Sequence, residues 1–187
     1  MPSIRSLRAN VTREEAMEQF ASHGIGTALK NTVYGPLQSV ADFYIPFLLF
    51  QVEIQNRGKT ESRIYGLDAI NGSLDPYQFE DLPGTFDIVY LETRNCAKPM
   101  LDEAGAKALL ISKVRRLLFS TGFFRMSNLQ ITAEVVPGEI HIPYWVGFRG
   151  RGPRAQFTVM DAMRRTIEGA KVRHLLRDWL TSIAVNS

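Results

Sequence analysis

The sequence contains little cysteine and no long apolar run. Its single cysteine, Cys96, excludes an intramolecular disulfide and a zinc cluster built from several cysteines. The longest apolar segment, residues 43–50, is interrupted by Pro46 and is far shorter than the roughly 20 residues of a membrane helix. The first sixteen residues have charges but no apolar core, so we expect no secretory signal. These absences predict a cytoplasmic protein without a membrane span.

Charge is divided unevenly along the 187 residues. Residues 1–93 contain 7 Lys and Arg against 12 Asp and Glu, a net charge of −5, whereas residues 94–187 contain 15 against 7, a net charge of +8. The two halves attract each other, or the basic half meets an acidic partner. A composition of 45% hydrophobic and 22% charged residues is typical of a globular protein. We expect a single compact domain over residues 1–187.

Three segments have helical signals. Thr12 and Glu15 form a capping box, which predicts a helix that ends near His23. Residues 102–119 and about 167–184 place apolar side chains at helical spacing. In the last segment these side chains form an unbroken stripe, which predicts an amphipathic C-terminal helix. The stripe consists of Val172, Leu175, Leu176, Trp179, Leu180 and Ile183.

Several segments rich in β-branched and aromatic residues are predicted to be strands. They are residues 43–54, 63–70, 86–92, 129–136, 139–148 and 155–162. Pro137-Gly138 is expected to form a turn between two of them, and Asn71-Gly72 is a second turn signal. Residues 148–154, FRGRGPR, are expected to form the tip of a hairpin.

A short motif occurs twice and in the same order of elements. Residues 44–47 read YIPF and residues 141–144 read HIPY. Two further matches are LDA at 67–69 with MDA at 160–162, and EEA at 14–16 with DEA at 102–104. The order predicts an internal duplication with repeat units of about 11–93 and 99–187. We therefore expect an α+β fold in which two helix-plus-antiparallel-sheet units form one pseudo-symmetric domain with a C-terminal amphipathic helix.

The first unit resembles a known family. Its strand, polar hairpin and second strand lead into GLDAING at residues 66–72, a pattern similar to the PepSY module, whose second strand closes on an Asp-Ala-x-x-Gly turn. The second unit keeps Asp161-Ala162 but has Arg165 at the position of the glycine. The resemblance implies a small binding or inhibitory module rather than a catalyst. PepSY-like modules are usually exported or membrane-attached, and this sequence shows neither signal.

The sequence offers few catalytic or metal-binding patterns. Asp68 and Asp161 either meet as an acid–base pair or cap the turns that follow their strands. The three histidines lack metal-site spacing. Arg94 and Lys98 flank Cys96 and favour its thiolate, but no base or oxyanion site lies nearby in the sequence. We therefore predict no catalytic residue, no metal and no cofactor.

The remaining candidates concern binding. Phe47, Tyr144 and Trp145 either line an apolar ligand cavity between the units or simply pack in the core. The leading prediction is a non-enzymatic binding module for a protein partner or a small apolar ligand, and homo-oligomerisation stays open. The alternative is nucleic-acid binding through the basic second half. Its residues are Lys113, Arg115, Arg116, Arg149, Arg151 and Arg154.

Overall fold

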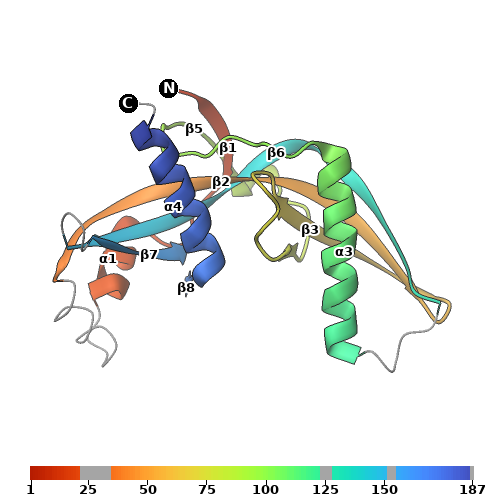
Figure 1. The fold of residues 1–187 in the computed structure, drawn as a ribbon. Helices are drawn as coiled ribbons and strands as arrows, with labels where there is room; N and C mark the ends of the chain where they lie inside the picture. The colour runs from red at the N-terminus through yellow and green to blue at the C-terminus, as the bar shows by residue number, and fades with distance from the viewer. Residues whose placement is uncertain (22–34, 123–127, 151–154, 186–187) are drawn as a thin grey trace.

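The protein has an α+β fold built around two very long antiparallel strands (Figure 1). A computed structural model describes residues 1–21, 35–122, 128–150 and 155–185. The described strands are β1 (Ser3–Leu7), β2 (Leu37–Asn56), β3 (Lys59–Asp68), β4 (Tyr77–Phe79), β5 (Ile88–Glu92), β6 (Gln130–Arg149), β7 (Gln156–Asp161) and β8 (Thr166–Ile167). The described helices are α1 (Arg13–Ala21), α3 (Glu103–Gly122) and α4 (Ala170–Val185), with a 3-10 turn η1 (Thr85–Asp87).

One sheet joins all the described strands. Its main order is β4-β3-β2-β6-β1-β5, and the β7–β8 ribbon pairs with the C-terminal part of β6. The two IP motifs face each other at the centre of the β2–β6 pair, where Ile45 lies opposite Ile142. The β2–β3 hairpin turns at Arg57-Gly58, both with positive φ, a geometry that matches the right-handed twist of a hairpin.

The expected turn at Pro137-Gly138 is wrong. β6 is continuous through these residues, which form a bulge: Ile140 pairs with Phe47 and Val136 pairs with Leu49, so three residues of β6 stand opposite Leu48. Gly138 has φ of 95°, which favours glycine because it carries no side chain. Pro137-Gly138 is typical of a turn, but β6 pairs with β2 on both sides of the dipeptide, so the strand continues through it.

The helices cover the two faces of the sheet at different places. Phe50, Val52 and Ile54 of β2 are buried against α3, which lies near one end of the long strands (Figure 1). Alternate residues of β2, from Phe43 to Leu49, point to the other face and belong to the core cluster beneath α4. Because successive side chains in a strand point to opposite faces, this central part of β2 is buried on both sides.

The helix starts agree with the sequence signals. Thr12 and Glu15 form the expected capping box: the Glu15 N–H donates to the Thr12 hydroxyl at 3.2 Å, and the Thr12 N–H donates to the Glu15 carboxylate at 2.8 Å. Asp102 caps α3 by accepting the Gly105 N–H at 2.9 Å. In α4, the stripe residues Val172 and Leu176 are buried, whereas the side chain of Ile183 lies outside the described part of the structure.

Candidate functional site: a cavity between β1, the 94–100 connector and α4

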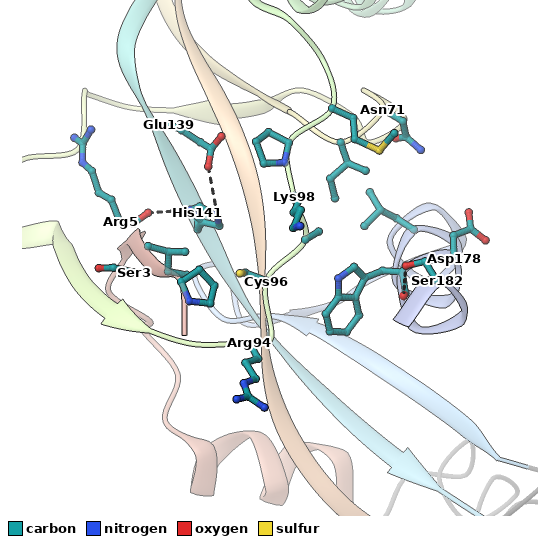
Figure 2. A pocket seen from close by; sticks show the side chains of 18 residues that line it. Ser3, Arg5, Asn71, Arg94, Cys96, Lys98, Glu139, His141, Asp178 and Ser182 are labelled. Atoms are coloured by element: carbon teal, nitrogen blue, oxygen red, sulfur yellow. Dashed lines mark hydrogen bonds and ion pairs between the residues drawn. The ribbon is translucent and has the colours of Figure 1, made fainter. Parts of the chain in front are cut away.

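A cavity of about 1020 Å³ lies between β1, residues 94–100 and α4 (Figure 2). We call it the β1–α4 cavity. Its volume is at the upper end of the roughly 300–1,000 Å³ that small-molecule sites usually occupy. No local sequence pattern indicates this cavity, because its walls come from segments far apart in the chain and β1 has no recognisable pattern.

Backbone hydrogen bonds hold two walls of the β1–α4 cavity in place. The connector runs beside β2: the Tyr44 N–H donates to the Asn95 carbonyl at 2.8 Å, and the Ala97 N–H donates to the Tyr44 carbonyl at 3.2 Å. β1 runs parallel to β6, and the Ser6 hydroxyl donates to the His141 carbonyl at 3.1 Å. The connector therefore follows the outer edge of β2 and β1 follows the outer edge of β6, and residues of both line the cavity.

The third wall is the apolar stripe of α4. Leu175 is buried, and Trp179 is partly buried with its ring centroid 4.5 Å from that of Phe43. Met100 completes the apolar lining from the connector, although 80% of its surface is exposed. The exposed methionine gives the cavity an adaptable apolar surface, because its side chain is unbranched and flexible.

Glu139 and His141 form the polar corner of the β1–α4 cavity (Figure 2). Glu139 is the last residue of the bulge in β6, and its carboxylate lies 3.5 Å from the His141 Nε2. The His141 Nδ1 lies 3.2 Å from the Arg5 carbonyl oxygen, a contact that is a hydrogen bond when Nδ1 bears the proton. Burial lowers the pKa of His141 and raises the pKa of Glu139, so the site favours the neutral form of each group.

Cys96 lines the same cavity without an activating partner. Burial raises the pKa of its thiol, the nearby Glu139 carboxylate raises it further, and Lys98 acts in the opposite direction. The Cys96 Sγ donates to the Thr93 carbonyl at 3.8 Å, and no hydrogen bond to His141 exists among the described residues. The described residues also contain no group of three His, Cys, Asp or Glu side chains able to hold a metal. The prediction that the protein is not an enzyme stays a prediction.

The two strand-end aspartates do not meet. Asp68 accepts three backbone N–H groups of its own turn, from Asn71, Gly72 and Leu74, at 2.8–3.1 Å. Asp161 accepts the N–H groups of the two residues 163 and 164 at 2.7 and 2.9 Å. Each side chain caps its own turn, as one of the two sequence interpretations predicts, and the two aspartates do not form an acid–base pair.

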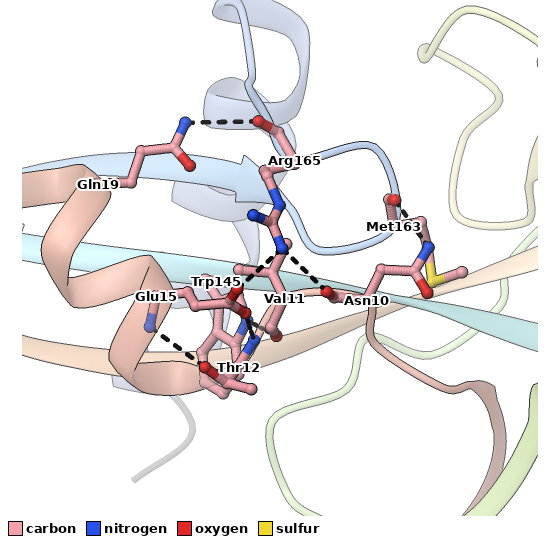
Figure 3. A network of polar contacts seen from close by, with 8 residues as sticks. All are labelled: Asn10, Val11, Thr12, Glu15, Gln19, Trp145, Met163 and Arg165. Carbon is pink, nitrogen blue, oxygen red and sulfur yellow. Dashed lines mark hydrogen bonds and ion pairs between the residues drawn. The ribbon is translucent and has the colours of Figure 1, made fainter.

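Two of the three predicted ligand residues lie together elsewhere. Phe47 and Tyr144 line a second cavity, of about 470 Å³, near the start of α4. Trp145 lies apart from them in the core cluster that packs against α1, and its indole N–H donates to the Val11 carbonyl at 2.8 Å (Figure 3). The same small network holds Arg165 to Glu15 of α1 through an ion pair of 2.9 Å.

The residues of the nucleic-acid alternative do not gather into one exposed surface in the described structure. Arg149 was expected at a hairpin tip but is only 4% exposed, because its guanidinium group donates to the Phe20 carbonyl near the end of α1. The Lys113 ammonium donates to the Leu74 carbonyl at 2.8 Å, and burial lowers its pKa. Arg115 and Arg116 are exposed on α3. The last two candidates, at 151 and 154, lie outside the described residues.

Comparison with other proteins identifies no relative of the chain. None of the described helices combines the length and the apolar composition that a membrane span requires. No protein-family model matches the sequence, and no curated protein or solved structure matches it significantly. The PepSY resemblance therefore stays a prediction, and the function has to be argued from the site.

Proposed function

We propose that the protein is a non-enzymatic binding module that holds a small, largely apolar ligand in the β1–α4 cavity. The observation that supports this function is the lining of the cavity, which combines a partly buried Trp179 and an exposed Met100 with a small polar corner formed by Glu139 and His141. Small-molecule sites typically combine concave apolar walls with a few polar groups that orient the ligand. A hollow of this size favours a small molecule over the flat patch that a protein partner usually covers.

The proposal predicts that a charge at the mouth of the β1–α4 cavity weakens ligand binding. Met100→Asp is expected to raise the Kd of the amphiphilic dye 8-anilinonaphthalene-1-sulfonate about tenfold, because its aromatic rings lose an apolar contact and its sulfonate meets a like charge. Met17→Asp introduces the same charge on α1, where the methionine is 44% exposed and does not line this cavity. Dye fluorescence is titrated against both variants and the unmodified protein.

The control separates a local effect from a general effect of charge. We expect Met17→Asp to bind the dye like the unmodified protein, with thermal unfolding checked for both variants. Equal binding by all three proteins, or equal losses in both variants, would place the dye outside the cavity and count against the proposed function.

We also propose that the fold consists of two related units. Two equivalent registers support this: Phe47 lies opposite Asp68 in the first hairpin, and Tyr144 lies opposite Asp161 in the second. The two helix caps also correspond, but they align α1 with α3 two residues away from the match of EEA with DEA in the sequence. Thr12 and Asp102 occupy the same position before α1 and α3, so the residue that corresponds to Ala16 is Ala106 rather than Ala104.

The hydrogen bonds that lead into each helix follow the same rule. The Asn10 N–H donates to the Ala162 carbonyl at 2.9 Å, and the Met100 N–H donates to the Ala69 carbonyl at 2.7 Å. Each bond joins the segment before one helix to the residue that follows the second hairpin strand of the other unit. In this arrangement the segment before α3, which includes Cys96, corresponds to β1, and the β1–α4 cavity lies between these equivalent segments.

A further inference from the structure

Three basic side chains line the β1–α4 cavity. Arg5 comes from β1, and Arg94 and Lys98 come from the connector. None of the three forms an ion pair with a carboxylate within the part of the chain that the structure describes. Arg94 and Lys98 are exposed, so solvent reaches them, yet their charges surround a cavity whose other wall is apolar.

Lys98 is the basic group best placed to meet a ligand. Figure 2 shows its side chain near the centre of the view, on the connector that also carries Cys96, whereas the side chains of Arg5 and Arg94 extend toward the periphery. The ammonium group of Lys98 is near enough to Cys96 to lower the pKa of its thiol. A cation at this point faces the apolar stripe of α4 across the cavity.

The acidic residues of the cavity do not neutralise Lys98 by direct contact. Glu139 faces His141, with 3.5 Å between the carboxylate oxygen and Nε2. Asp178 of α4 also lines the cavity, but its carboxylate points away from Lys98 in Figure 2. Burial raises the pKa of Glu139 above its ordinary value.

We propose that the ligand of the β1–α4 cavity is an anionic amphiphile, whose carboxylate binds the ammonium group of Lys98 and whose hydrocarbon chain lies along Trp179 and Leu175. This inference rests on the proposed function and adds the charge of the ligand. A charge-assisted hydrogen bond from the ammonium to a carboxylate is stronger than one to a neutral hydroxyl. Burial of the ligand's hydrocarbon chain against the apolar wall favours binding for every head group.

The test compares three eight-carbon probes that share a chain and differ in head group: octanoate, 1-octanol and octylammonium. Isothermal titration calorimetry on the full chain gives the Kd of each probe. We expect octanoate to bind about tenfold more tightly than 1-octanol, and octylammonium to bind more weakly than either. Added salt is expected to reduce the advantage of octanoate, because exposed charges are screened.

Substitutions of single lysines test whether Lys98 causes the preference for octanoate. Lys98→Met keeps the length of the side chain and removes the charge, so the preference for octanoate over 1-octanol is expected to fall to less than about twofold while 1-octanol still binds. Lys59→Met, in the β2–β3 hairpin and away from the cavity, is the matched control and is expected to keep the full preference.

The outcomes distinguish the two proposals. Equal affinities for octanoate and 1-octanol, or a preference for octylammonium, overturn the anionic ligand and leave the apolar cavity in place. A preference for octanoate that survives Lys98→Met also overturns the assignment to Lys98. Failure of all three probes to bind overturns the proposed function itself.

Discussion

Replacing Asp68 by asparagine is expected to lower the free energy of unfolding by about 2–3 kcal/mol. The Asp68 side chain is fully buried, and both of its oxygens are used: Oδ1 accepts the N–H groups of Asn71 and Gly72, and Oδ2 accepts that of Leu74 at 2.8 Å. In asparagine one of these oxygens becomes an NH₂ group. A buried backbone N–H then faces another donor and loses its acceptor, which costs its full desolvation.

Asp161→Asn is the matched control, because this residue ends the equivalent strand of the second hairpin. It is also fully buried, but only its Oδ1 accepts backbone N–H groups, and its Oδ2 has no hydrogen-bond partner in the described structure. An amide nitrogen in the place of Oδ2 leaves both turn bonds intact. We expect a change between zero and about 1 kcal/mol in favour of the variant, because a buried carboxylate with an unpaired oxygen is costly.

Urea denaturation of both variants measures this difference directly. The expected result is a clear fall in the denaturation midpoint for Asp68→Asn and an unchanged or higher midpoint for Asp161→Asn. Equal destabilisation by both substitutions would contradict the account of the two turns, because it would mean that Oδ2 of Asp161 is as fully bonded as that of Asp68.

The difference in the free energy of unfolding between wild type and Asp161→Asn is also expected to depend on pH. Burial raises the pKa of Asp161 above its ordinary value, so the folded state binds the proton more tightly than the unfolded state. The resulting stability is fully present below the unfolded pKa, near 3.9, and is lost as the pH rises through the folded pKa. Asparagine does not titrate, so the advantage of the variant should be largest at neutral pH and should shrink on acidification.

Trp179→Ala is expected to lower the free energy of unfolding by about 3 kcal/mol, the lower end of the usual range for a core tryptophan. The indole is partly buried and packs against Phe43 of β2, with 4.5 Å between the ring centroids. Its removal leaves a void between α4 and the sheet and enlarges the β1–α4 cavity. Thermal and urea unfolding of the variant give the loss.

Phe86→Ala provides the control for aromatic truncation as such. Phe86 is 92% exposed, so its loss is expected to change stability by less than about 0.5 kcal/mol. If Trp179→Ala proves equally mild but reduces self-association in sedimentation experiments, the apolar stripe of α4 faces a second copy of the chain, and the cavity description would have to be revised.

Local signals in the sequence predict the elements well where one residue pattern determines one structure. Thr12 and Glu15 satisfy each other within four residues, so the start of α1 is readable without the rest of the chain. The stripe of α4 is equally local, since helical spacing alone aligns Val172 and Leu176 on the buried face. The mixed α+β character follows from these elements and from the strands of the two hairpins.

The features that depend on distant pairing could not be predicted. Pro137-Gly138 has the same sequence signal whether it forms a turn or a bulge, and only the register with β2 decides between them. β1 has five residues with no strong pattern, yet its pairing with β5 and β6 makes it one wall of the cavity. Cys96 and His141 are 45 positions apart in the chain, so no local pattern relates them, yet both line the cavity.

The tryptophan content of the chain allows a direct test of the β1–α4 cavity as the binding site. The chain contains two tryptophans: Trp179 lines the cavity, and Trp145 lies in the core cluster against α1. Incorporation of 5-fluorotryptophan gives one ¹⁹F resonance for each, assigned with a Trp145→Phe variant. On titration with octanoate, the account predicts a saturable shift of the Trp179 resonance while the Trp145 resonance stays in place. No shift at saturating probe, or a shift of the Trp145 resonance alone, would contradict a binding site in this cavity.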